Sequence, residues 1–239
     1  MLNARSPEAR KQLARFAGAV YLLLAIASAL GFYHAPLVQG DLGAIARTLT
    51  HSDLRFHIGV VADVLSAVFA VPLAVLLYEL LRSVDKMQAV LMALLLVVAV
   101  PISFVVALNY VAAQWLLTGQ PVVAGLAGTS RQALAMLFLG LHAHGVLAVE
   151  IFWGLWLLPF GRLVMRSRFL PNLLGILLII AGIAYVAHSI TSLMLGGQRI
   201  VVYERITMLA RAAGELPIIL WLLIKGADTR VRIESEPVQ

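Results

Sequence analysis

Long apolar runs separated by short polar connections dominate the chain. Six of these runs are long enough to cross a bilayer, which takes about 20 residues at a helical rise of about 1.5 Å per residue. The pattern predicts spans at residues 14–33, 57–81, 88–117, 133–159, 172–195 and 206–224. Each span must be a helix, because a backbone inside hydrocarbon has to satisfy its own hydrogen bonds. The sequence therefore predicts an all-α fold, a bundle of six transmembrane helices.

The connections between the spans are short. Only the segment from His34 to Leu54 has room for extra structure, such as a short interfacial helix. We expect a basic N-terminal segment over residues 1–13, a transmembrane domain over residues 14–225 and a disordered polar tail over residues 226–239. The first span also has the basic start and small residues of a cleavable signal peptide. The apolar and aromatic continuation "LGFYHAP" favours a retained helix instead.

Composition agrees with a lipid environment, since 62% of the residues are hydrophobic and only 13% are charged. The chain contains no cysteine, which excludes disulfides and thiolate metal sites. The net charge of +6 comes from short basic runs beside the spans, not from a basic face that could bind nucleic acid. Twelve of the 18 Lys and Arg residues fall on the side of both termini. This bias predicts that both termini are cytoplasmic.

Several ionisable residues interrupt the apolar spans. A charge at the centre of a bilayer costs about 2.5–3.5 kcal/mol, so such residues usually face the bundle interior and have partners. Counted from the outer ends of the helices, Asp63 lies about 12 Å inside the second span and His188 about 10 Å inside the fifth. His142 and Glu215 each lie about 14 Å inside the fourth and sixth spans. Because four helices offer polar groups at a similar depth, we expect these four residues to form one site.

Helical geometry separates the polar residues of "LGLHAHGVLAVEIFWGLW" from one another. His142 and His144 are two residues apart and therefore point about 200° away from each other. We expect His142 to face the interior and His144 to sit at a helix contact. Glu150 lies about 12 Å further along the helix, where we expect it to pair on the cytoplasmic side. Arg211 and Glu215 are four residues apart, so a local ion pair is an alternative to a shared site.

Four stretches carry a resemblance to a known family. They are "ARFAGAVYLLL", "LRFHIGVVADVLSAVFAVPLAVLLYELLRSVDK", "GELPIILWLLIKG" and the longer run from "LFLGLHAHGVLAVEIFWGLW" through "GRLVMRSRFLPNLLGILLIIAGIAYV". Their order and spacing resemble the bacterial membrane family DUF4386. The positions that match the family pattern are Arg55, Asp63, Tyr78, His142, Gly175 and Glu215. The chain differs from it at His188, where an Asp is common, and in the third span, which lacks the arginine of many relatives. The resemblance implies a multi-pass protein of the bacterial inner membrane and brings no activity.

Three functions suit such a site, and the sequence leaves them open. Two imidazoles and two carboxylates (His142, His188, Asp63 and Glu215) are a ligand set for zinc or another divalent ion, whose bound water could hydrolyse a lipid. Alternatively, the same groups relay protons or grip a substrate in a proton-coupled transporter. A third function is binding of haem, with His142 paired to His57 or His188, or of another lipophilic ligand.

The partners follow from the same residues. We expect membrane lipids around the bundle and a lipophilic or anionic small molecule in a polar cavity open to the extracytoplasmic side. Arg55 and Asp63 are about 80° apart around one helix, so both can border its inward face. Arg55 would then sit at the rim and attract an anionic group. The predicted cavity residues are Arg55, Asp63, His142, His188, Arg211 and Glu215.

Overall fold

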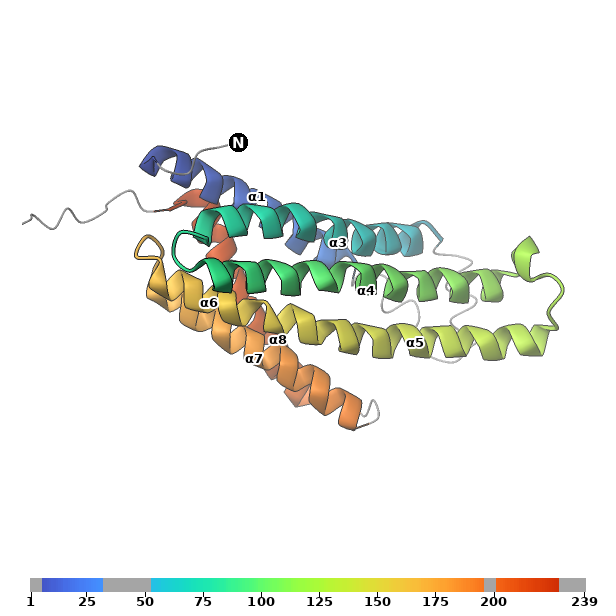
Figure 1. The fold of residues 1–239 in the computed structure, drawn as a ribbon. Coiled ribbons are helices and arrows are strands. Elements are labelled where there is room, and N and C mark those ends of the chain that lie inside the picture. The colour runs from blue at the N-terminus through green and yellow to red at the C-terminus, as the bar shows by residue number, and fades with distance from the viewer. Residues whose placement is uncertain (1–5, 32–52, 196–200, 228–239) are drawn as a thin grey trace, which may run out of the picture.

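The computed structural model describes residues 6–31, 53–195 and 201–227, and these parts of the chain are helical (Figure 1). The helices are α1 (Pro7–Gly31), α3 (Asp53–Leu81), α4 (Lys86–Thr118), α5 (Gly128–Leu155), α6 (Leu157–Arg166), α7 (Asn172–Met194) and α8 (Val201–Ile224), with a short 3-10 turn, η2 (Pro121–Val123). α5 and α6 follow one another as a rod of 39 residues. The described residues thus contain six helical rods long and apolar enough to span a membrane, as the sequence predicts.

The rods form a closed ring in chain order. α1 packs against α3, α3 against α4, and α4 against the α5–α6 rod. α7 packs against that rod and against α8, and α8 returns to α1. Each rod therefore has its chain neighbours as its neighbours in space. This arrangement is what short connections between antiparallel helices favour.

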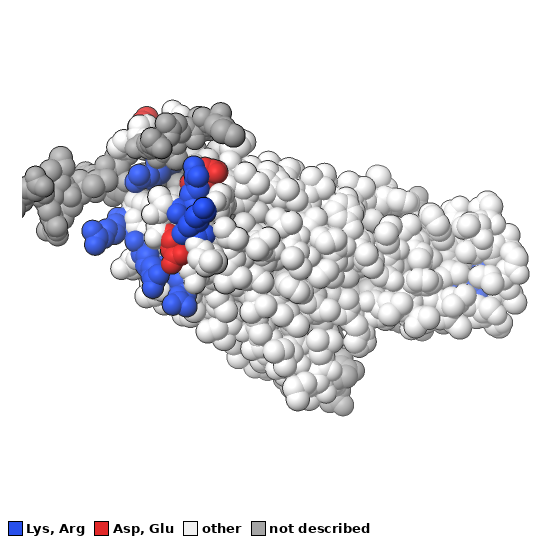
Figure 2. Space-filling view, viewed as in Figure 1, with Lys and Arg blue, Asp and Glu red and all other residues white. Residues whose placement is uncertain are grey.

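One end of the ring carries most of the described basic residues, and we call it the basic end (Figure 2). Arg15 donates to the carbonyl of Ile224 at 2.9 Å, which joins the start of α1 to the end of α8. Arg166 bonds Asp85 at 3.1 Å, which joins α6 to the turn between α3 and α4. Asp85 also caps α4 by accepting from the backbone of Gln88. The first and last described residues of the chain lie at this end.

The half of the bundle next to the basic end is filled with apolar side chains, which we call the apolar half. Leu73, Leu157, Phe160 and Leu163 are all completely buried there. The rods approach closely at glycines. A methyl group added to Gly161 would lie 2.6 Å from the carbonyl oxygen of Gly175 on α7. Small residues at such contacts allow close van der Waals packing, which holds helices together in lipid.

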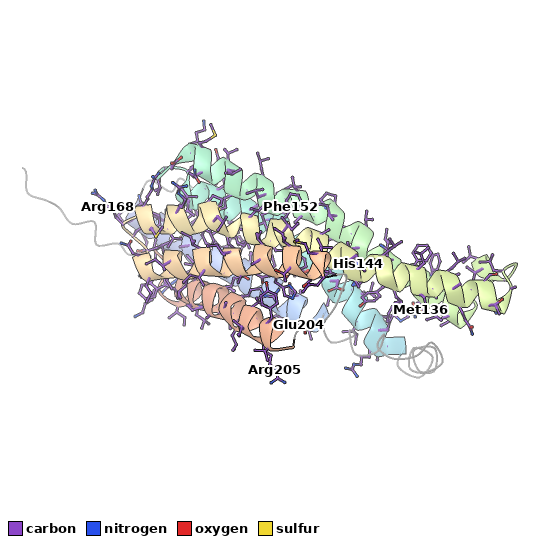
Figure 3. The ribbon with its side chains drawn as sticks, turned by 90° about the horizontal axis from the view of Figure 1, so that it is seen from below. Met136, His144, Phe152, Arg168, Glu204 and Arg205 are labelled. Carbon is purple, nitrogen blue, oxygen red and sulfur yellow. The ribbon has the colours of Figure 1, made fainter. Side chains whose placement is uncertain are left out.

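Away from the basic end, α4 and α5 extend past the other helices as a hairpin (Figure 1). α4 has 33 residues, whereas α7 has 23 and α8 has 24. In Figure 3, Met136 lies on the hairpin beyond the ends of α7 and α8, whereas Phe152 lies alongside them. Gly119 ends α4 with a left-handed backbone (φ 68°), which glycine adopts without strain. This unequal helix length matters for the polar residues.

Candidate functional site: a buried two-carboxylate cluster

Six polar side chains from four helices meet beyond the apolar half. We call them the two-carboxylate cluster: Tyr21 of α1, Glu150 of α5, Tyr185 and His188 of α7, and Arg211 and Glu215 of α8. Each member lies on a helix that also contributes to the ring, so the packing of the helices positions it. The cluster contains two carboxylates and one arginine.

The first carboxylate, Glu150, is held by two nitrogen donors. Arg211 donates to Oε1 of Glu150, and Nδ1 of His188 lies 2.9 Å from Oε2. The Glu150 side chain is only 4% exposed, and those of His188 and Arg211 are 13% and 19% exposed. A buried carboxylate is tolerated when both of its oxygens are paired in this way. This ion pair ties α5 to α7 and α8.

The second carboxylate, Glu215, is held by hydroxyl groups. Tyr21 donates to Oε2 at 2.5 Å, and Tyr185 donates to Oε1 at 2.7 Å. O–H donors at these distances form strong bonds to a carboxylate. Glu215 is partly exposed, in contrast to Glu150. The two hydroxyls connect α8 to α1 on one side and to α7 on the other.

Tyr185 links the two carboxylates. Its hydroxyl bonds Glu215, and the guanidinium of Arg211 lies over its ring at 4.8 Å from the centroid. A cation at this distance is attracted by the ring. Arg211 therefore contacts Glu150 directly and Glu215 through the tyrosine. His188 continues the chain of contacts by stacking on Tyr203, with the ring centroids 5.9 Å apart.

A separate group of polar residues surrounds His142 on the hairpin side. Nδ1 of His142 lies 2.8 Å from the carbonyl oxygen of Val106, and its ring stacks on Tyr110 of α4 with centroids 3.4 Å apart. Tyr110 packs edge-on against Phe56 near the start of α3, next to the partly buried Arg55. Asp63 lies further along α3, with its carboxylate against Gly31 at the end of α1.

The structure divides the predicted site residues between these two groups. His188, Arg211 and Glu215 belong to the two-carboxylate cluster, whereas His142 bonds the Val106 carbonyl and stacks on Tyr110 of α4. The four proposed metal ligands are divided as well. In residues 6–31, 53–195 and 201–227, no three His, Asp or Glu side chains are placed to hold one metal ion.

Three expectations about individual residues differ from the structure. Arg211 forms its ion pair with Glu150 of α5, not with Glu215 one turn away on its own helix. Glu150 joins the cluster instead of pairing towards the basic end, where Glu79 pairs with Arg82 at 3.0 Å. His144 is exposed and bonds the carbonyl of Gly140 on its own helix at 2.9 Å, whereas we expected it at a helix contact (Figure 3).

The hairpin explains why Glu150 was misplaced. Depth was counted from the outer end of the fourth span, but α5 begins in a hairpin that extends past α7 and α8. The residue level with His188 and Arg211 is therefore Glu150, eight positions beyond His142. Tyr21 and Tyr185 were also missed. Their one signal is a hydroxyl-bearing ring in the middle of an apolar span, which tyrosine often supplies for packing alone.

Six apolar rods in a closed ring, with paired charges buried between them, define the chain as a multi-pass membrane protein. The comparison with family models then gives the family. The model described as "Domain of unknown function (DUF4386)" matches residues 16–226, so the chain belongs to this family and the resemblance noted above is confirmed. None of the curated proteins and none of the solved structures compared with the chain matches it.

Proposed function

We propose that this protein is a proton-coupled carrier in which the two-carboxylate cluster binds and releases one proton. The observation that carries the proposal is the imbalance of charge in the cluster, which has two carboxylates but one arginine. With Glu150, Glu215 and Arg211 all ionised and His188 neutral, one negative charge is left over. Such a charge is costly inside a bilayer, so a proton on Glu215 stabilises the resting state.

The geometry supports a role for Glu215 as the group that exchanges the proton. Its partners are hydroxyls, which can donate to a carboxylate or accept from a carboxylic acid. Glu150, by contrast, is buried and already paired with a cation. Glu150 therefore stabilises the arrangement of the helices, while Glu215 changes its protonation.

Arg211 couples this change to the position of α8. It lies four residues before Glu215 on the same helix, so both side chains share one face. When Glu215 loses its proton, the new negative charge attracts the guanidinium away from Glu150, and the tie between α8 and α5 weakens. Pro217 follows directly in the same helix, where its missing N–H removes a backbone hydrogen bond and eases bending. Protonation would thus favour one packing of α8 and deprotonation another.

We place the exchange site in the bacterial inner membrane, open to the side opposite the basic end. The excess of Lys and Arg on the side of the termini supports a cytoplasmic basic end. A reporter active only in the periplasm, fused after Gln239, should be inactive. Activity of that reporter would invert the topology.

Proton binding can be measured without knowing the substrate. Proteoliposomes on a solid-supported membrane electrode are stepped from alkaline to mildly acidic buffer, and the displaced charge is integrated. We expect a transient in the wild type that Glu215→Gln removes. Glu79→Gln, the same chemical change in a carboxylate at the basic end, should leave it unchanged. A wild-type signal equal to that of protein-free liposomes, or an undiminished signal in Glu215→Gln, would refute the proposal.

A further inference from the structure

We infer that Glu215, together with Tyr21 and Tyr185, is the binding site for a lipophilic organic cation, which takes the place of the exchanged proton. This inference rests on the proton exchange proposed above and names the class of substrate. In the exchange, the O–H bond of the Glu215 acid breaks, the proton leaves to water, and the carboxylate pairs with the incoming cation. No bond to the cation forms, so charge balances with one cation for one proton.

The charges around Glu215 favour a cation over an anion. The groups that reach its carboxylate from neighbouring helices are two neutral hydroxyls, Tyr21 from α1 and Tyr185 from α7. Among the described residues, the cation next to it is Arg211, which is on the same helix and is paired with Glu150. An anion entering here would meet two carboxylates and would have to take Arg211 from its partner. A cation would neutralise the one negative charge of the two carboxylates that Arg211 does not balance.

The aromatic rings give the site its preference for an organic cation. One face of the Tyr185 ring meets the Arg211 guanidinium at 4.8 Å from the centroid, so this ring already takes part in a cation–π contact. On the other side of Glu215, the Tyr21 ring is completely buried against Trp156, with centroids 5.8 Å apart, and holds its hydroxyl on the carboxylate. Aromatic rings beside a carboxylate bind cations that carry apolar groups, because the rings attract charge without demanding hydrogen bonds.

The bonding partners distinguish the two carboxylates in the same way. Glu150 has both oxygens paired to nitrogen donors. Glu215 is bonded to neutral hydroxyls. A cation that pairs with Glu215 therefore replaces hydroxyl donors, not a nitrogen donor. This places the ligand site on the α1–α8 side of the cluster.

The test uses tetraphenylphosphonium and tetraphenylborate, two ions of the same shape and opposite charge. Each is added to detergent-purified protein in weak buffer, and proton release and binding heat are recorded. We expect tetraphenylphosphonium to bind and release one proton per chain, and tetraphenylborate to release none. Glu215→Gln should abolish the proton release, while Glu79→Gln should keep it.

A pair of variants at Tyr185 tests the ring separately. Tyr185→Phe keeps the ring, so cation affinity should change little, whereas Tyr185→Leu removes it and should weaken binding by roughly tenfold, as a cation–π contact of about 1–2 kcal/mol implies. This pair remains informative if Glu215→Gln does not fold. Equal affinities in the two variants would refute the aromatic site.

The remaining outcomes separate the two proposals. Charge displacement on the acid step, without any effect of tetraphenylphosphonium, would overturn the cation site and leave proton exchange standing. Glu215-independent proton release, or tighter binding of tetraphenylborate, would also overturn the cation site. Absence of charge displacement in the wild type would overturn the proposed function itself.

Discussion

The two halves of the bundle use the same helices for opposite purposes. In the apolar half, α8 contributes Ile218 and Leu222, which are completely buried among leucines and Phe160. One to two turns earlier, the same helix contributes Arg211 and Glu215 to the two-carboxylate cluster. The first region is held by close packing and the second by paired charges. Packing has one best arrangement, whereas two acids and one arginine can be paired in more than one way.

The ion pairs of the molecule differ in the same manner. At the basic end, the side chains of Arg82 and Glu79 are 53% and 36% exposed, so solvent screens their attraction. In the cluster, Arg211 and Glu150 are 19% and 4% exposed. A buried pair is weak evidence for stability as a whole, but removing one member is costly. The comparison therefore predicts a graded series of effects.

The largest effect is expected for Arg211→Met. It leaves Glu150 buried without its cation, which should lower the free energy of unfolding by about 3–5 kcal/mol. Thermal unfolding in detergent measures the loss. The double variant Arg211→Met with Glu150→Met should recover most of it, because a buried pair can be replaced by apolar residues. A double variant as unstable as Arg211→Met would show that the unpaired Glu150 carboxylate is not the cause of the instability.

The apolar half should respond next, at its closest helix contact. In Gly161→Ala the added methyl meets the Gly175 carbonyl, so the helices must move apart, which we expect to cost about 1–3 kcal/mol. Gly140→Ala on the same rod is the control, since nothing lies within 4 Å of the added methyl. There the better helix propensity of alanine should stabilise by up to about 1 kcal/mol. If the unfolding temperatures of Gly161→Ala and Gly140→Ala shift in the same direction from the wild type, the close contact at Gly161 is contradicted.

A smaller effect is expected for Tyr185→Phe. The substitution removes the hydroxyl from Glu215 and keeps the ring under Arg211. Hydrogen bonds between membrane helices contribute about 0.6 kcal/mol on average, so stability should fall by about that amount. The charge displaced by the acid step should differ clearly from that of the wild type, although the stability is nearly unchanged, because a donor to the exchanging carboxylate is lost. A loss as large as that of Arg211→Met would mean that the hydroxyl, not the ion pair, holds the cluster.

The smallest effect is expected for Arg82→Met at the basic end. Its pair with Glu79 is exposed and spans one turn of α3, so removal should cost about 0–1 kcal/mol. Raising the salt concentration in the unfolding experiment should abolish even this difference. A cost equal to that of Arg211→Met would show that exposure does not separate the two kinds of pair.

Much of the fold could be predicted from hydrophobic pattern alone. The predicted spans end at residues 81 and 224 and begin at residue 172, as the helices do. Charged and turn-forming residues interrupt the apolar runs there. The predicted boundaries differ at both ends of the bundle. At the basic end, α1 begins at Pro7 instead of residue 14, and α6 ends at Arg166 instead of residue 159. At the opposite end, α5 begins at Gly128 instead of residue 133, and α8 at Val201 instead of residue 206. Helices that continue into polar sequence leave no hydrophobic signal at their ends.

The site could be predicted only in part, for two physical reasons. Chemistry and burial cost single out His188, Arg211 and Glu215, and these three do lie in one cluster. Depth along a helix, however, depends on where that helix begins relative to its neighbours. The sequence does not show how far the start of α5 is shifted relative to α7 and α8, so the prediction put His142 in the site where the structure has Glu150. The segment from His34 to Leu54, where we expected an interfacial helix, and the tail from residue 228 lie largely or wholly outside the described residues.

The hairpin of α4 and α5 does not match the thickness of an ordinary bilayer. α7, with 23 residues, is about 35 Å long and fits a hydrocarbon core of about 30 Å at an ordinary tilt. α4, with 33 residues, is about 50 Å long and would still reach about 38 Å along the bilayer normal at a tilt of 40°. Its outer part exposes Leu108 and Trp115, so lipids must thicken around it or leave apolar surface in water. The tilt of α5, and with it the position of Glu150 relative to Arg211 of α8, should therefore depend on the acyl-chain length of the surrounding lipids.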